Sequence, residues 1–357
     1  MISSPRAALE ALVSTPGLTR IDPPILMSAD PYFDLAGEEF RRRLVLTSGV
    51  DGEEYCLRPD FTLPIARHYL ENGVGEAAYS YLGTLFRQRP DGPAEFDQTG
   101  LELIGQPDPA AALDRVIHFA RDVLMTYGVT APRVRIGSVA LFEAVLAGAE
   151  MPDVWRPRLR HRFGHAGSLD ALLERLSDPH GAEGNIRTPP LAEIETDVAG
   201  RMAAAGLPFD TSRAPAEIAA RYLEKQALAA AYVPGETIQL LTDYLGVAGP
   251  VETALATIGG LIETPPAGFE VARAAIRRHF ETLGQCLPGA EIVFDAGFAP
   301  RLDYYTGLVF EMTGEDGAVL ASGGEYDRLL QRLGAGREIA ASGCALWVDR
   351  LEKEGGK

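Results

Sequence analysis

The 357-residue chain carries 33 Lys and Arg against 50 Asp and Glu, a formal net charge of -17, and 46% of its residues are hydrophobic. This length fits one large domain or two ordinary ones. The acidity argues against a broad nucleic-acid surface, because binding to phosphates depends on Lys and Arg. No stretch resembles a signal peptide or reaches the roughly 20 apolar residues of a membrane span, so we expect a cytoplasmic protein with no membrane partner.

Two hairpins are predicted in the first third of the chain. Residues 43–58, "RLVLTSGVDGEEYCLR", contain two β-like runs joined by a turn around Asp51-Gly52. Residues 78–105 contain two longer runs on either side of "PDGP". Gln98 and Glu102 lie four apart in the second run, so they are expected on one face of the sheet.

An amphipathic helix is predicted to follow the second hairpin. Apolar residues recur at spacings of three and four within "DPAAALDRVIHFARDVLMTYG". Asp108 provides the cap, Pro109 the first turn and Gly128 the end of the helix.

The middle of the chain, 161–283, is rich in Ala and Leu, and we interpret it as a mainly helical insertion. Its breaks, such as "DPHGAEGN" and "ETPPAGFE", fit linkers or tight turns between helices. Strand-like runs return afterwards, so residues 1–160 and 284–357 are predicted to form one core. Strand hairpins, then helices, then strands predict an α+β fold on a largely antiparallel sheet.

The cysteines and histidines give no metal signal. Cys56, Cys286 and Cys344 are far apart and outside any CxxC spacing, which fits a reducing compartment. His161 and His165 are four apart in "HRFGH", but a glycine separates them and no acidic ligand lies nearby. We therefore expect ordinary surface or core histidines, and we predict neither a metal nor a cofactor.

Four segments, read together, resemble the catalytic core of histidyl-tRNA synthetase, a class II aminoacyl-tRNA synthetase. They are "YCLRPDFTLPIARHYL", "LFRQRPDGPAEFDQTGLELIG", "RLDYYTGLVFEM" and "ASGGEYDRLLQRLG" with the following "AASGCALWVDRL". The resemblance covers about residues 20–105 and 294–351. It implies a class II synthetase-like antiparallel sheet flanked by helices.

The resemblance also implies a histidine-binding site. Asp60 and Thr62 match the positions that hold the amino acid's ammonium group, and Gln98 and Glu102 match those for the amino acid and the imidazole. Tyr305 and Tyr326 match two tyrosines that enclose the imidazole, although ordinary core tyrosines remain an alternative. The matching residues are Asp60, Thr62, Arg87, Gln98, Glu102, Tyr305 and Tyr326.

The positions implied for ATP chemistry are altered. Arg87 and Arg350 match family arginines, but two other family arginines fall on Ala94 and Pro300. Trp347 stands where the family has a glycine that leaves room for adenine. Activating an amino acid needs fixed positive charge around the phosphates, so these changes oppose catalysis. Arg301 could take over the role of the arginine displaced at Pro300.

The sequence also stops at Lys357, soon after the last segment, so we expect no anticodon-binding domain and no tRNA partner. The combination resembles the regulatory subunits of ATP phosphoribosyltransferase, which are paralogues of histidyl-tRNA synthetase. It implies a non-catalytic protein that senses L-histidine, activates a short catalytic subunit, and forms a homodimer within a hetero-oligomer. Alternatives are an enzyme that still activates histidine with ATP, and a sensor of uncharged tRNA, which the charge disfavours.

Overall fold

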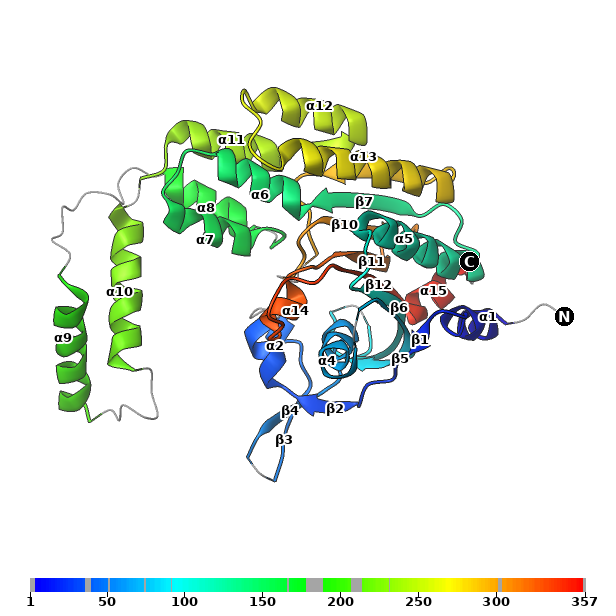
Figure 1. The fold of residues 1–357 in the computed structure, drawn as a ribbon, viewed down its shortest axis with the longest axis horizontal. Helices are drawn as coiled ribbons and strands as arrows, with labels where there is room; N and C mark the ends of the chain where they lie inside the picture. Colours follow the sequence, from blue (N-terminus) through cyan, green and yellow to red (C-terminus); the bar gives the residue numbers. More distant parts are fainter. Residues whose placement is uncertain are drawn as a thin grey trace. The chain divides into compact units, whose positions relative to one another are not determined.

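The computed structural model describes residues 4–35, 40–50, 52–73, 75–90, 92–165, 167–177, 189–206, 214–230, 232–300 and 304–355. The chain divides into two compact units. The first consists of Met1–Gly148 with Tyr244–Lys357, and the second of Ala149–Asp243. Figure 1 shows the helices and strands in chain order.

The first unit is built on a large sheet with strand order β1-β5-β6-β12-β11-β10-β7-β9-β8. The pairs β1/β5 and β7/β9 are parallel and the other neighbours antiparallel. The strands are β1 (Thr19–Arg20), β5 (Ala77–Phe86), β6 (Glu95–Ile104), β7 (Arg133–Ser138), β8 (Ala248–Pro250), β9 (Glu291–Asp295), β10 (Leu308–Thr313), β11 (Val319–Glu325) and β12 (Ala341–Trp347). This is the predicted, largely antiparallel arrangement.

Both predicted hairpins form. β3 (Leu46–Ser48) and β4 (Glu54–Leu57) pair antiparallel, and β2 (Leu26–Ser28) completes a small sheet with order β2-β4-β3. β5 and β6 pair along their whole length. The predicted turn residues Asp51 and Asp91 lie outside the described residues.

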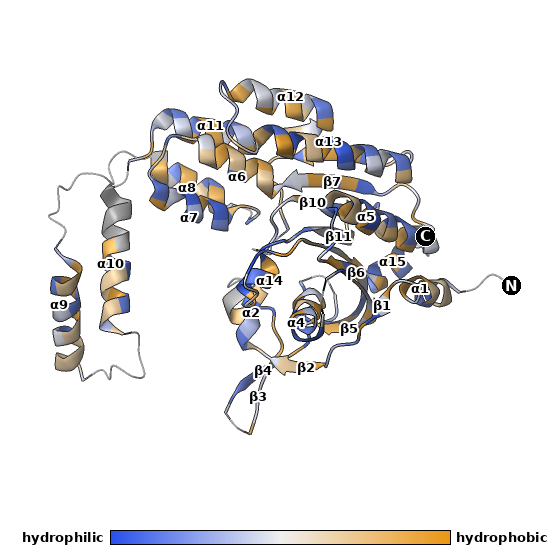
Figure 2. Ribbon diagram, in the orientation of Figure 1, coloured by the Kyte–Doolittle hydropathy of each residue, from blue (hydrophilic) through white to orange (hydrophobic). Residues whose placement is uncertain are grey.

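The helices of the first unit pack around this sheet. They are α1 (Pro5–Val13), α2 (Asp30–Leu35), α4 (Thr62–Asn72), α5 (Pro109–Thr126), α6 (Val139–Gly148), α12 (Val251–Leu261), α13 (Phe269–Cys286), α14 (Leu329–Arg332) and α15 (Val348–Gly355). Helix α13 carries both hydrophilic and hydrophobic residues (Figure 2), and its buried face includes the hydrophobic Phe269 and Ile276. Burial of such faces is the main source of helix stability.

Helix α5 begins and ends where the sequence predicts. The Asp108 carboxylate accepts a hydrogen bond from the Ala111 N–H at 2.9 Å, Pro109 opens the first turn, and Gly128 has a φ of 78°. The predicted apolar face is buried, and it packs against β6, β11 and β12. This helix therefore covers one face of the sheet's centre.

The second unit is helical. It contains a 3₁₀ turn at Asp153–Trp155, α7 (Arg156–Arg162), α8 (Ser168–Ser177), α9 (Leu191–Ala204), α10 (Pro215–Ala230) and most of α11 (Gly235–Leu245). Its bounds differ from the predicted insertion of 161–283. The difference arises because α12 contacts β8 and β9, and α13 contacts α5 and α6, so both helices belong to the sheet unit. The predicted break "DPHGAEGN" lies outside the described residues.

Candidate functional site

Two buried polar side chains on β6 mark the candidate site. Gln98 and Glu102 are 3% and 1% exposed. In the register of β6 with β12, Leu101 pairs with Cys344, whose thiol contacts the Val116 carbonyl oxygen in α5. Because side chains alternate along a strand, Gln98 and Glu102 lie on the face opposite α5, as their spacing predicts.

A glycine on the neighbouring strand makes room for the Glu102 carboxylate. Gly343 pairs directly with Glu102, and a Cβ atom at Gly343 would lie 1.7 Å from Glu102 Oε2. No real Cβ contact is that short, so position 343 admits only glycine while Glu102 keeps this rotamer.

Glu102 accepts hydrogen bonds from two hydroxyl groups. The Thr62 hydroxyl donates to Oε1 at 2.7 Å, and the Tyr326 hydroxyl donates to Oε2. Burial nevertheless raises the pKa of Glu102 to about 8, because desolvation outweighs the two donors. A further N–H donor would favour the charged form of this carboxyl group, which burial disfavours.

Asp60 forms a second acidic position just before α4. The carboxylate is 9% exposed, and it accepts a hydrogen bond from the Tyr32 hydroxyl at 3.1 Å. Burial raises the pKa of Asp60 to about 6, against the opposing effects of Arg87, Tyr32 and the Leu63 backbone N–H. Tyr32, on α2, has no sequence signal that links it to Asp60.

Arg87 brings positive charge to Asp60. Its guanidinium carbon lies 5.6 Å from the Phe40 ring centre and 5.5 Å from that of Phe96. Burial lowers the pKa of Arg87 to about 10, and the nearby Asp60 carboxylate opposes this effect. The guanidinium therefore stays charged at neutral pH, and the site presents one anionic and one cationic group.

Three tyrosines adjoin Glu102. The ring centre of Tyr304 lies 5.2 Å from that of Tyr305 and 5.7 Å from that of Tyr326, and the Tyr305 and Tyr326 centres are 6.5 Å apart. All three are buried. The predicted pair Tyr305 and Tyr326 thus lies together, and Tyr304, which precedes Tyr305 in the chain, lies beside both.

Direct interactions connect six of the seven predicted histidine-binding residues. The seventh, Gln98, shares a sheet face with Glu102. The arrangement can bind a small molecule that carries an ammonium, a carboxylate and a polar N–H group.

The region next to Gln98, where the resemblance places ATP, is occupied by Trp347, and its arginines have partners within the protein. Trp347 pairs in register with Gln98, so its indole lies on the same face of the sheet. The Arg350 guanidinium carbon lies 5.3 Å from the indole ring centre, and Nη1 donates to the Val319 carbonyl oxygen at 2.9 Å. Arg89 donates to the Asp349 carboxylate at 2.8 Å, with its own side chain 6% exposed.

The two positions where family arginines are missing bring no charge to this region. Ala94 contributes its carbonyl oxygen, which accepts from the Arg87 N–H at 2.7 Å, and Pro300 is partly buried. Arg301 lies outside the described residues.

No group of three or more His, Cys, Asp or Glu suited to a metal occurs among the described residues. The rings of His161 and His165 are 6.2 Å apart, centre to centre. Within the same described residues, no helix combines the length and apolar character that crossing a membrane requires.

Comparison with known proteins decides the family. The histidyl-tRNA synthetase family model matches residues 2–178 and 212–351. The ATP phosphoribosyltransferase regulatory subunit of Allorhizobium ampelinum is 40% identical over 354 residues, which are 94% of this chain and 93% of that protein. This chain belongs to that regulatory-subunit family. The regulatory subunit of Sinorhizobium medicae is 38% identical, over 95% of this chain and 93% of its own length.

Solved structures confirm the predicted fold. An ATP phosphoribosyltransferase regulatory subunit/histidyl-tRNA synthetase from Bacillus halodurans superposes with a TM-score of 0.69 at 23% identity, over 99% of this chain and 78% of that chain. Histidyl-tRNA synthetase from Nostoc gives 0.61 at 15% identity, over 98% and 70%. The relatives' names describe a regulatory subunit, in agreement with the prediction that this chain is not itself the enzyme.

Proposed function

We propose that this chain binds L-histidine at Glu102 and its neighbours, and that the bound amino acid regulates a short catalytic subunit of ATP phosphoribosyltransferase. In this proposal the chain activates the catalytic subunit and transmits feedback inhibition of histidine biosynthesis. The observation that carries the proposal is the buried Glu102 carboxyl group, held by two hydroxyls over a glycine.

The chemistry of the site supports an amino-acid ligand. Asp60 can accept from an ammonium group, and Arg87 supplies charge for a carboxylate. Glu102 can pair with an imidazole N–H, with the rings of Tyr305 and Tyr326 beside it. The buried side chain of Gln98 offers a further polar group on the same face.

The alternative, an enzyme that activates histidine with ATP, is favoured by the presence of Arg87 and Arg350. Arg350 is instead engaged by the Val319 carbonyl and the indole of Trp347. Ala94 and Pro300 supply no charge to a phosphate. These observations support a regulatory role over phosphoryl chemistry.

The proposal extends to assembly and location. The names of the relatives imply a catalytic partner in the ATP phosphoribosyltransferase complex. We propose a homodimer within a hetero-oligomer in the cytoplasm. We propose no tRNA partner, because a net charge of -17 opposes binding to a polyanion.

Titration calorimetry with L-histidine tests the ligand. Glu102→Ala should weaken binding by about 1–3 kcal/mol, because the imidazole N–H loses its buried acceptor. Glu95→Ala is the matched control, since Glu95 begins the same strand but is exposed. Unchanged affinity in Glu102→Ala would remove Glu102 from the site. Histidine-dependent exchange of pyrophosphate into ATP would support the enzyme alternative instead.

A further inference from the structure

The two adjacent tyrosines of the site sit directly before a short hydrogen-bonded junction. Tyr304 and Tyr305 are followed by Thr306, whose N–H donates to the Glu325 carbonyl oxygen at 2.8 Å. Tyr326, the third tyrosine, follows Glu325 and donates its N–H to the Ala341 carbonyl oxygen at 2.8 Å. The junction between residues 306–308 and 325–327 therefore determines where all three rings lie.

Side chains of the junction add three more hydrogen bonds. The Glu325 carboxylate accepts from the Leu308 N–H at 2.8 Å, and the Thr306 hydroxyl accepts from the Asp327 N–H at 3.0 Å. Asp327 Oδ1 accepts from the Ala341 N–H at 2.9 Å. We call Thr306, Glu325 and Asp327 the clasp.

A glycine makes room for the clasp. A Cβ atom at Gly307 would lie 2.0 Å from Glu325 Oε2, so the residue between Thr306 and Leu308 has to lack a side chain. This explains why a glycine follows the paired tyrosines and the threonine in "YYTG".

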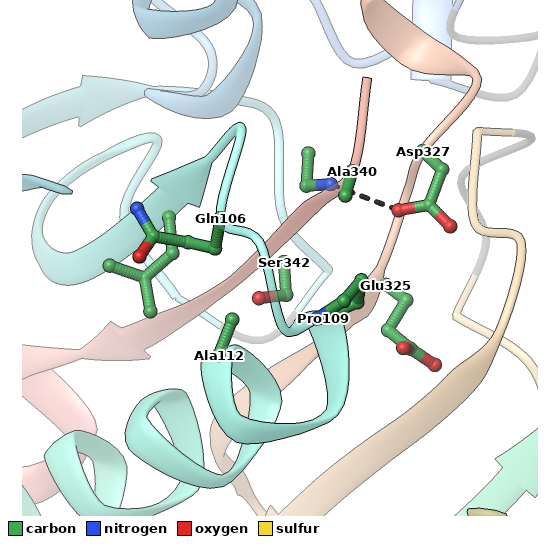
Figure 3. A pocket seen from close by; sticks show the side chains of 9 residues that line it. Gln106, Pro109, Ala112, Glu325, Asp327, Ala340 and Ser342 are labelled. Atoms are coloured by element: carbon green, nitrogen blue, oxygen red, sulfur yellow. Dashed lines mark hydrogen bonds between the residues drawn. The ribbon is translucent and has the colours of Figure 1, made fainter. Parts of the chain in front are cut away.

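The clasp carboxylates do not touch the candidate histidine site. Glu325 pairs with Ser342, one residue from the Gly324 and Gly343 pair, so its side chain lies on the α5 face. Figure 3 shows Glu325 and Asp327 at the edge of a small hollow beside Ser342 and Ala112. Both carboxylates accept backbone N–H groups, those of Leu308 and Ala341, so they act on the protein itself.

We propose that Glu325 is a positioning residue, which fixes Tyr304 and Tyr305 against Tyr326 through the clasp and thereby sets the affinity for the amino acid. The effect on affinity rests on the proposed function, because that function names the ligand. The hydrogen bonds of the clasp do not depend on it. Glu325 acts through the carboxyl oxygen that accepts from the Leu308 N–H, and a negative charge is not needed. Burial raises the pKa of Glu325 to about 7, with Asp327 adding to the effect, so the carboxyl is partly neutral near pH 7.

Two substitutions at one position separate these roles. Glu325→Ala removes the acceptor and leaves the Leu308 N–H unpaired, whereas Glu325→Gln keeps an amide oxygen in its place. A matched control exists in the turn between β10 and β11, where the Glu315 N–H donates to Oε1 of Glu354, on α15, at 2.7 Å. Glu354→Ala removes a bond of the same kind without touching the tyrosines.

Calorimetry with L-histidine should show binding about tenfold weaker in Glu325→Ala and within about twofold of the wild type in Glu325→Gln and Glu354→Ala. Equal affinity in Glu325→Ala and the wild type would overturn the inference. An equal loss in the alanine and glutamine variants would also overturn it, since charge rather than the acceptor would then be responsible.

Hydrogen exchange of the peptide that contains Tyr304–Leu308 tests the clasp without any ligand. Exchange should be faster in Glu325→Ala, and in Thr306→Val if the alanine variant fails to fold, but not in Glu325→Gln. Unchanged exchange in the first two would overturn the clasp. If the wild type does not bind histidine, the proposed function is wrong. The exchange experiment still tests the clasp, because it needs no ligand.

Discussion

Glu102→Gln tests whether the buried carboxyl group of the candidate site lowers the free energy of unfolding when it is charged. The folded-state pKa of Glu102 is about 8, against an ordinary value of 4.5, because burial disfavours the charged form. A folded-state pKa above the unfolded one means that the folded protein holds the proton more tightly. The group's contribution to stability is therefore fully present below about pH 4.5 and is lost as the pH rises to about 8.

The size of the effect follows from the two pKa values. Their difference corresponds to at most about 5 kcal/mol of unfolding free energy, and relaxation of the site should reduce it to about 2–4 kcal/mol. Glutamine has nearly the same shape, never ionises, and can still pair with the hydroxyls of Thr62 and Tyr326. Relative to the wild type, the variant should thus gain stability as the pH rises.

Urea unfolding at about pH 5 and about pH 8.5 measures this difference directly. Glu325 also has a raised pKa, of about 7, but it remains in the variant and cancels in the comparison. The Asp60 charge adds to the raised pKa of Glu102, so its repulsion is part of the effect that the variant removes. Glu95→Gln, on the exposed end of β6, is the control and should show no pH-dependent gain. If the stability difference between Glu102→Gln and the wild type is the same at both pH values, ionisation of Glu102 does not affect folding.

Two further substitutions test the geometry around the site. Gly343→Ala should abolish histidine binding in calorimetry, because its Cβ would lie 1.7 Å from Glu102 Oε2, whereas Gly336→Ala, with open space around it, should bind as the wild type does. Tyr32→Phe removes the hydroxyl that donates to Asp60. It should weaken histidine binding by about 0.5–1.5 kcal/mol while Tm changes little. Unchanged affinity would show that Tyr32 does not contribute to the site.

Local sequence signals predicted much of the sheet unit. Asp108, Pro109 and Gly128 set the ends of α5 because capping and left-handed backbone geometry depend on a few adjacent residues. The common face of Gln98 and Glu102 follows from the period of two in a strand. Such features need no knowledge of the rest of the fold.

Contacts between distant segments could not be predicted in this way. Tyr32 reaches Asp60 across 28 positions, and Glu325 reaches Leu308 across 17, with no spacing that links either pair. The boundary at residue 243 was missed because α12 and α13 resemble the preceding helices in composition. Only their packing on β8, β9, α5 and α6 assigns them to the sheet unit.

In the proposed function, this chain senses histidine on behalf of a catalytic partner. The most direct measurement mixes the purified chain with the short catalytic subunit from the same source and follows formation of phosphoribosyl-ATP, with and without L-histidine. We expect activity to rise on mixing and to fall with histidine, and we expect the Glu102→Ala chain to activate but to lose the inhibition. No activation on mixing, or inhibition that persists in Glu102→Ala, would contradict it.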